Sequence, residues 1–124
     1  MRLLLDTHVL IWRLEGNDRL SAEAATALRV TPTVFVSVVS AWEIAIKSSL
    51  GKLRLPGPVE EGLDHCGFLR LAIEFRHVAV LRGLAAHHRD PFDRMLVAQA
   101  QAEDMVLVTA DRRFEAYGVP ILWA

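Results

Sequence analysis

Five short apolar runs, separated by helix-like segments, constrain the fold of this chain more than any other feature. The runs are Leu3–Leu5, Val34–Val36, Phe68–Ile73, Met105–Val108 and Ile121–Trp123. Short apolar runs of this kind are typical of strands that are buried on both faces of a parallel sheet. Strands that alternate with helices favour such a sheet with helices on both faces. We therefore predict an α/β protein, a three-layer α/β/α domain with a central parallel sheet of four to five strands.

The segments between the runs carry recognisable helix starts and stops. Helices are predicted over residues 8–14, 22–30, 59–66, 74–84, 91–102 and 111–117, and from a cap at Ser37 or Ser40 to about Leu50. The clearest start is Asp90-Pro91, because Asp is a favoured N-cap and Pro suits the first helical position. These helices account for every long connection between the predicted strands.

The length of 124 residues predicts a single domain over residues 1–124, with a core of its own. Cys66 is the only cysteine, which excludes an intramolecular disulfide and favours a reducing compartment. The first residues lack the apolar core of a signal peptide, and no apolar run approaches the roughly 20 residues that span a bilayer. We therefore expect a cytoplasmic protein.

Four acidic residues are candidate metal ligands. Asp6 ends the first strand, Asp111 follows the fourth, and Asp93 opens the helix that leads into the fourth. Glu43 lies about one turn into the helix after the second strand, within reach of the same edge. Ligands of open parallel sheets bind at the carboxyl ends of the strands, so we expect these side chains to meet there. Converging carboxylates repel one another unless a cation binds, and oxygen ligands suit Mg²⁺ or Mn²⁺.

Each of these acids also has a purely structural explanation. Asp6 and Asp111 can serve as helix caps, and Asp93 can support the start of its helix in a variant of the capping box. Glu43 can form an ion pair with Lys47, four residues further along the helix. That pair explains Glu43 less well, since its helix is apolar nearly all round and a buried carboxylate needs a partner.

Several polar residues near the same edge are candidates for supporting roles. The hydroxyls of Thr7, Ser40 and Thr109 can donate hydrogen bonds to the carboxylates, or equally cap helices. The adjacent His87 and His88 have no partner that would complete a zinc set, and we predict a turn there.

The charge balance bears on nucleic-acid binding. The net charge is −1, from 14 Lys and Arg against 15 Asp and Glu, whereas proteins that bind nucleic acid by charge are usually basic. Any such binding must therefore be local. Arg94, Arg112 and Arg113 lie near the acids in the sequence and are weak candidates for phosphate contacts, although solvated helix faces explain them as well.

Four stretches of the chain carry a resemblance to a known family. They are Leu-Leu-Leu-Asp-Thr-His-Val-Leu-Ile-Trp (3–12), Val-Ser-Val-Val-Ser-Ala-Trp-Glu-Ile-Ala-Ile-Lys (36–47), His-Arg-Asp-Pro-Phe-Asp-Arg-Met-Leu-Val-Ala-Gln-Ala (88–100) and Leu-Val-Thr-Ala-Asp-Arg-Arg-Phe (107–114). In order and spacing the chain resembles the PIN-domain ribonucleases, in particular the VapC-like toxins of bacterial type II toxin–antitoxin systems. The last two stretches are fairly specific together.

The resemblance implies a compact α/β/α fold and cleavage of RNA that depends on Mg²⁺ or Mn²⁺. It places the catalytic and metal-binding acids on Asp6, Glu43, Asp93 and Asp111. By the same resemblance, Asp90 is a cap or a neighbour of the site, and Thr109 is its polar neighbour. The resemblance implies three partners: an RNA substrate, a second copy in a homodimer, and an antitoxin that lies across the N-terminal helices. Trp12, Leu14, Leu20 and the helix over 22–30 offer apolar surface for that antitoxin, with core burial as the alternative for Trp12.

Two other functions are compatible with an acidic site on this fold. One is a phosphotransfer domain of the receiver or phosphatase type, which needs a lysine from a late strand end, and no lysine follows Lys52. The other is a non-catalytic interaction module with a PIN fold. The intact acids at all four positions argue against it.

Overall fold

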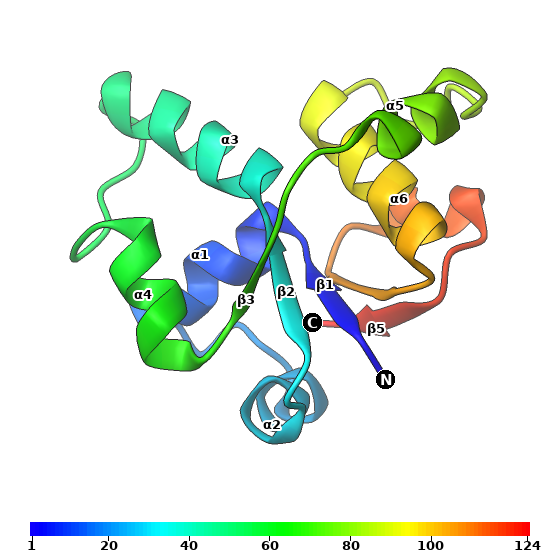
Figure 1. Cartoon of the computed structure of the whole chain (residues 1–124). Helices are drawn as coiled ribbons and strands as arrows, with labels where there is room; N and C mark the ends of the chain where they lie inside the picture. Colours follow the sequence, from blue (N-terminus) through cyan, green and yellow to red (C-terminus); the bar gives the residue numbers. More distant parts are fainter.

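Five parallel strands form one sheet in the computed structural model, which describes all residues from 1 to 124. The strands are β1 (Leu3–Leu5), β2 (Val34–Ser37), β3 (Leu69–Leu71), β4 (Val106–Thr109) and β5 (Ile121–Trp123). Their order is β3-β2-β1-β4-β5, so the first strand is central and β3 and β5 are the edges (Figure 1). Every neighbouring pair is parallel, which confirms the predicted α/β class.

Six α-helices and one 3-10 helix connect the strands. They are α1 (Thr7–Glu15), α2 (Ala22–Val30), α3 (Val38–Ser49), α4 (Val59–Cys66), α5 (Phe75–Arg82), α6 (Pro91–Glu103) and the 3-10 helix η1 (Arg112–Tyr117). Ser37, and not Ser40, caps α3, because its Oγ accepts a hydrogen bond from the backbone N–H of Val39 at 3.0 Å. None of the helices is long and apolar enough to cross a membrane.

The third strand is shorter than the predicted run 68–73. The backbone N–H of Phe68 donates to the carbonyl of Leu63 at 2.9 Å, so Phe68 closes the end of α4 and does not pair with β2. At the other end, pairing stops where Leu71 meets Ser37, the last residue of β2. The outer residues of the apolar run therefore belong to connections, because β2 offers them no partner.

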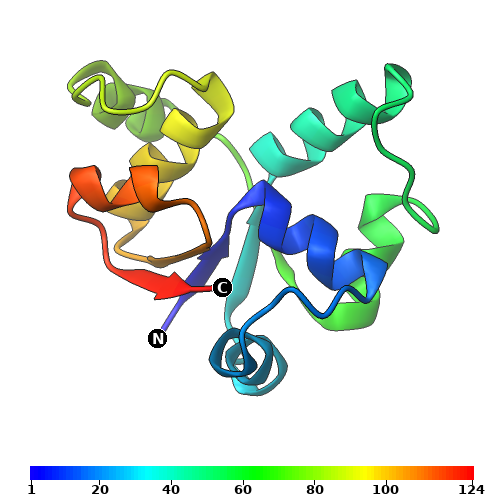
Figure 2. The same ribbon diagram turned by 180° about the vertical axis from the view of Figure 1, so that it is seen from behind.

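The central strand β1 sends alternate side chains to opposite faces of the sheet. Leu3 and Leu5 belong to a buried cluster with residues of α1, α2, α3 and α4, whereas Leu4 belongs to a second cluster with residues of α6 and η1. All three leucines are fully buried. Seen from behind, α5, α6 and η1 lie on one side of the sheet, and α1, α3 and α4 on the other (Figure 2). The predicted three-layer architecture is confirmed.

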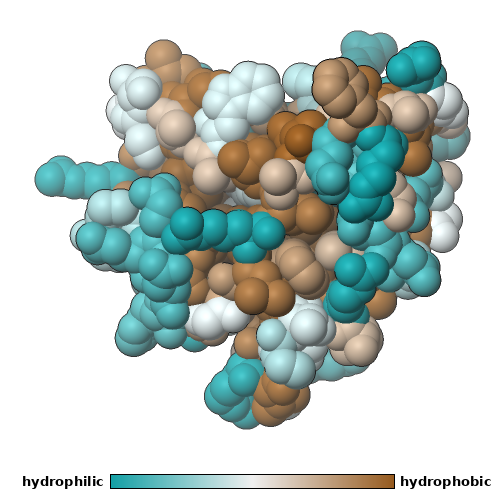
Figure 3. Space-filling view, viewed as in Figure 1, coloured by the Kyte–Doolittle hydropathy of each residue, from teal (hydrophilic) through white to brown (hydrophobic).

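Hydrophobic residues gather across the middle of the face on which the edge strand β3 lies, with hydrophilic residues to either side (Figure 3). Leu69 in β3 and Ile73 just after it are exposed. Along α3 and at its C-cap, every fourth residue is an exposed apolar side chain: Val38, Trp42, Ile46 and the cap residue Leu50. Part of the chain's apolar content is therefore on its surface.

The carboxyl ends of β1 and β4 lie side by side, because these strands pair with Leu5 opposite Val108. Asp6 follows directly, and its backbone N–H donates to the carbonyl of Val108 at 2.9 Å. This junction in the middle of the sheet is where the predicted acids meet.

Candidate metal centre

Asp6 stands at the N-terminus of α1, but its side chain does not cap that helix. Its Oδ2 accepts a hydrogen bond from the hydroxyl of Thr109 at 2.8 Å, and its Oδ1 is buried without a hydrogen-bond partner. Burial is the largest influence on the pKa of Asp6 and raises it, and the charge of Glu43 raises it further. The helix-cap explanation is therefore wrong for this side chain.

Glu43 is a buried carboxylate on α3, only 6% exposed. Its Oε2 forms the expected ion pair with Nζ of Lys47 at 3.0 Å. Its Oε1 is buried and has no hydrogen-bond partner. The ion pair thus accounts for one oxygen, and the other is free to bind a cation.

Asp93 lies in the first turn of α6, where Asp90 provides the cap by accepting the backbone N–H groups of Phe92 and Asp93 at 2.8 and 3.0 Å. The side chain of Asp93 does not complete a capping box, because the backbone N–H of Asp90 donates to Nδ1 of His88. Burial raises the pKa of Asp93 to about 8, and the charges of Asp6, Asp90, Glu43 and Asp111 add to this shift. Near neutral pH, Asp93 therefore favours its protonated form. A bound cation would offset the repulsion from the neighbouring carboxylates and favour the charged form.

Asp111 combines a cap with a place in the acidic group. Its Oδ1 accepts the backbone N–H of Arg113 at 2.9 Å, so the cap explanation holds for this residue. Its Oδ2 lies 2.8 Å from Nη2 of Arg113. Burial acts to raise the pKa of Asp111, but the hydrogen bonds and charge of Arg113 outweigh it and lower the pKa. Asp111 is therefore charged near neutral pH, and its contacts with Arg113 hold its side chain in place.

The four predicted acids come together at the carboxyl ends of the central strands β1 and β4. The negative charge of each of the other three acids raises the pKa of Asp93, which shows that all four lie close together. A cavity of about 210 Å³ opens beside them, lined by Asp6, His8, Trp12, Ala110 and Asp111. The predicted ligands are all carboxylates, and the buried oxygens of Asp6 and Glu43 without partners are donors that a hard divalent cation such as Mg²⁺ or Mn²⁺ would satisfy. The residues present fit such a cation.

The predicted hydroxyl neighbours play different parts. Thr109 bonds directly to Asp6 and also accepts the backbone N–H of Asp111 at 3.0 Å, so it links two of the acids. Thr7 and Ser40 instead share a buried hydrogen bond of 2.9 Å. They join α1 to α3 and so hold together the two helices beside Asp6 and Glu43.

The three candidate arginines differ in their surroundings. Arg94 donates to the backbone carbonyls of Leu84 and Ala85 at 3.3 and 3.0 Å, which ties its guanidinium to a turn. Arg112 lies 4.0 Å over the ring of Trp123, and Arg113 pairs with Asp111. Arg112 and Arg113 are exposed beside the acids, so they suit phosphate contacts better than Arg94 does.

His88 is a residue of the site that the sequence analysis missed. It lies in a loop, as expected, but it is buried, and its Nε2 lies 2.9 Å from Oδ2 of Asp93 and 3.4 Å from Oδ2 of Asp111. Its position two residues before the N-cap Asp90 was the available signal, since a residue there can fold back over the first turn of the helix. The neighbouring His87 is exposed and lies against Tyr117.

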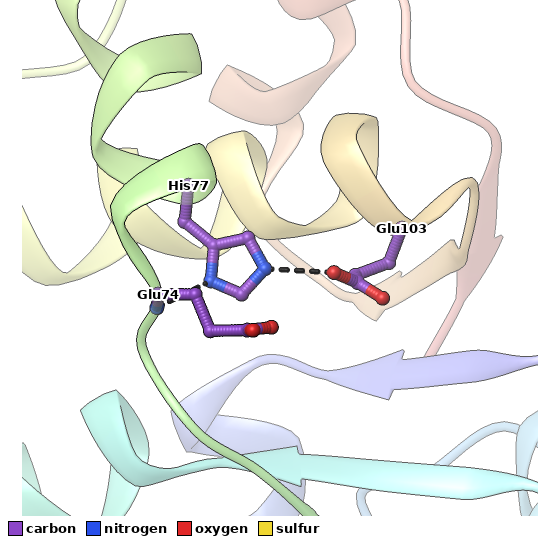
Figure 4. Close-up of side chains that lie close together, drawn as sticks. All are labelled: Glu74, His77 and Glu103. Atoms are coloured by element: carbon purple, nitrogen blue, oxygen red, sulfur yellow. Dashed lines mark hydrogen bonds and ion pairs between the residues drawn. The ribbon is translucent and has the colours of Figure 1, made fainter.

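A second group of histidine and acids lies between α5 and α6, at the opposite end of α6 from Asp93 (Figure 4). The ring of His77 is buried, accepts the backbone N–H of Glu74 at Nδ1 and contacts Oε2 of Glu103 through Nε2 at 2.8 Å. Arg76 pairs with both carboxylates. Because the chain already supplies a cation here, we interpret this group as an ion-pair link between two helices.

Comparison with known proteins places these features in context. The sequence model of the PIN domain matches residues 3–120. Ribonuclease VapC22 of Mycobacterium tuberculosis is 30% identical over 126 aligned positions that cover 95% of this chain and 93% of the relative. Ribonuclease VapC16 of the same organism is 37% identical over about half of each chain, 51%.

Solved structures share the same fold at low sequence identity. A DNA-bound VapBC from Salmonella typhimurium superposes with a TM-score of 0.75 at 17% identity, over 99% of this chain and 98% of that one. VapBC2 from Rickettsia felis, bound to a promoter DNA fragment, gives a TM-score of 0.76 at 14% identity, with the same coverage of 99% and 98%. The arrangement of strands and helices described above is thus found along the whole length of these chains.

Proposed function

Because the chain belongs to the PIN-domain family, we propose that it is an endoribonuclease toxin that hydrolyses RNA phosphodiester bonds with a divalent cation and is inhibited by a cognate antitoxin. The observation that carries this proposal is the meeting of four carboxylates from separate segments, two of them with buried oxygens that lack a partner. Full-length similarity to a protein named a ribonuclease supports the choice of reaction. The phosphotransfer alternative has no such support.

The acids that would hold Mg²⁺ or Mn²⁺ are Asp6, Glu43, Asp93 and Asp111. When bound, the cation lowers the pKa of the attacking water and neutralises charge that develops on the phosphate. The chain prepares its ligands in advance: Thr109 holds one oxygen of Asp6 and Lys47 holds one oxygen of Glu43, while the second oxygen of each stays free. Ligands oriented by such neighbours need little rearrangement on binding.

Binding of RNA would rely on local positive charge, since the chain as a whole has a net charge of −1. Arg112 and Arg113 are both exposed and next to Asp111. A guanidinium at this place can contact a phosphate of the scissile strand through two parallel hydrogen bonds. Arg113 would then exchange part of its bonding to Asp111 for the phosphate.

Two protein partners belong to the proposal, an antitoxin and a second copy of the chain. The solved relatives are described as VapBC assemblies. In this chain Trp12, Leu14 and Leu20 are only half-buried, and Leu14 and Leu20 pack at the rim of the core. The exposed apolar stripe of α3 and the edge strand β3 provide further surface that a partner would cover.

The test is cleavage of structured RNA by the purified chain in Mg²⁺ or Mn²⁺. The wild type should cleave, EDTA should abolish cleavage, and Asp93→Asn should lower the rate by more than about 100-fold, since even the neighbours of metal ligands are worth about 10–100-fold. Asp18→Asn makes the same chemical change at an exposed residue and serves as the control. Cleavage that survives EDTA or Asp93→Asn would refute the proposal, and a chain that takes up no Mn²⁺ specifically in calorimetry would favour the non-catalytic module.

A further inference from the structure

We propose that His88 is a positioning residue of the metal centre: its Nε2–H donates to the Asp93 and Asp111 carboxylates and sets their separation, and the ring is not itself a metal ligand. The inference rests on the proposed metal site and adds a residue to it. Nε2 lies 2.9 Å from Oδ2 of Asp93 and 3.4 Å from Oδ2 of Asp111, so one ring nitrogen faces acids from two different elements.

Burial, an aromatic neighbour and two backbone hydrogen bonds hold His88 in place. Its side chain is 2% exposed, and the ring lies 5.6 Å from that of Phe114, centroid to centroid. The backbone N–H of His88 donates to the hydroxyl oxygen of Tyr117 at 2.8 Å, and its carbonyl accepts from Arg94. A side chain fixed in this way can hold its neighbours at a set distance.

The tautomer of the ring follows from its other nitrogen. The backbone N–H of Asp90 points at Nδ1 of His88 over 3.2 Å, and a backbone N–H can only donate. Nδ1 must therefore be the unprotonated acceptor, and in the neutral ring Nε2 carries the proton. That proton is directed at the two carboxylate oxygens.

A donor at Nε2 excludes the ring from the coordination of a cation. To become a ligand, Nε2 would have to lose its proton while Nδ1 still faces an N–H group, which leaves no neutral form of the ring. His77, between α5 and α6, has the same arrangement of hydrogen bonds. Its Nδ1 accepts a backbone N–H, and its Nε2 contacts a carboxylate oxygen of Glu103. In both places the ring joins the start of a helix to an acid.

Calorimetry of Mn²⁺ binding to the full chain tests the positioning role. His88→Ala should weaken binding by about 10–100-fold, the usual cost of removing a hydrogen-bond partner of a metal ligand. His88→Gln carries an amide N–H near the place of Nε2 and should recover most of that loss. His87→Ala is the matched control, since His87 is exposed and should leave the affinity unchanged.

Long-range ¹H–¹⁵N NMR correlation of the wild-type ring tests the tautomer without any substitution. Nε2 should be protonated and Nδ1 unprotonated, with and without Mg²⁺. A protonated Nδ1, a Mg²⁺-dependent loss of the Nε2 proton, or unchanged Mn²⁺ affinity in His88→Ala would overturn the inference. If wild type and Asp93→Asn both fail to bind Mn²⁺, the metal centre itself is refuted, and the His88 inference falls with it. Normal wild-type binding with no effect of His88→Ala refutes the role of His88 alone.

Discussion

The hydroxyl of Thr109 donates a 2.8 Å hydrogen bond to Oδ2 of Asp6, and so joins the ends of two paired strands that lie 103 residues apart in sequence. Both side chains are buried, with Asp6 3% exposed and Thr109 fully buried. The bond engages one carboxylate oxygen and leaves the other without a partner. Thr109 therefore decides which oxygen of Asp6 is offered to a cation.

Thr109→Val should remove this bond without changing the shape of the side chain. We expect the free energy of unfolding to fall by about 1.5–3 kcal/mol, the range for a buried hydrogen bond to a charged group, and Mn²⁺ affinity to fall by about 10–100-fold. Urea denaturation and calorimetry measure the two effects. Thr109→Ser keeps the hydroxyl and should retain most of both, so equal losses in Val and Ser variants would contradict the prediction.

The raised pKa of Asp93 predicts how the stability of the metal-free protein depends on pH. The pKa is about 8 in the folded chain against 3.8 for an unperturbed Asp, so between these values the folded state binds more protons than the unfolded state. The free energy of unfolding must therefore fall as pH rises through this window. Asp93→Asn removes this contribution, and in EDTA at about pH 8 it should melt roughly 5 °C or more above the wild type.

Melting curves from about pH 5 to about pH 9 in EDTA test this directly. Asp111, whose pKa is lowered, does not interfere, because its stabilising contribution is complete above the unfolded pKa. Added Mg²⁺ should raise the melting temperature of the wild type more than that of Asp93→Asn. Parallel curves for the two proteins across the whole range would show that Asp93 is not protonated as described.

Lys47→Met tests what the ion pair with Glu43 contributes to the stability of the chain and to its affinity for Mn²⁺. The metal-free chain should lose about 1–3 kcal/mol, less than for a fully buried pair because the Lys47 side chain is 32% exposed. Mn²⁺ should bind more weakly, because Lys47 no longer holds Oε2 and so no longer orients the free Oε1 of Glu43. Lys52→Met is the control, at an exposed lysine without an ion pair. Tighter Mn²⁺ binding in Lys47→Met would show that the lysine competes with the cation instead of orienting Glu43.

Asp90 should behave as a helix cap and not as a metal ligand. Asp90→Ala removes the acceptor for two backbone N–H groups of α6 and should cost about 0.5–2 kcal/mol in urea denaturation. Asp90→Ser restores a capping oxygen and should regain that stability with Mn²⁺ affinity close to the wild type. A loss of Mn²⁺ binding in Asp90→Ser as severe as in Asp93→Asn would assign Asp90 to the ligands.

Local signals were enough to predict most of the fold. The pair Asp90-Pro91 marks the start of α6, and the apolar runs mark all five strands, because caps and hydrophobic periodicity act over a few residues. The length of β3 was not predictable in this way. Its ends depend on where β2 stops and on the closure of α4 by Phe68, which are contacts with other segments.

The acids could be proposed from their places at strand ends, but the details that make a site of them are not local. The position of His88 before the N-cap Asp90 predicts a contact with the first turn of α6. It does not predict the contact with Asp111, which lies 23 residues away. Arg94 was a phosphate candidate by proximity in sequence, yet the loop before α6 turns its carbonyls toward the guanidinium. Which oxygen of Asp6 or Glu43 remains free also depends on partners from other segments.

The central place of β1 has a consequence for how the protein is made. A ribosome that has completed the first half of the chain has produced Asp6 and Glu43, but not β4, which must pair with β1 before Thr109 can reach Asp6. Asp93 and Asp111 also follow later in the sequence, so a nascent chain holds an incomplete set of carboxylates until residue 111 has emerged. If the protein cuts RNA as proposed, the nascent chain would stay inactive until β4 and Asp111 have been made and β4 has paired with β1.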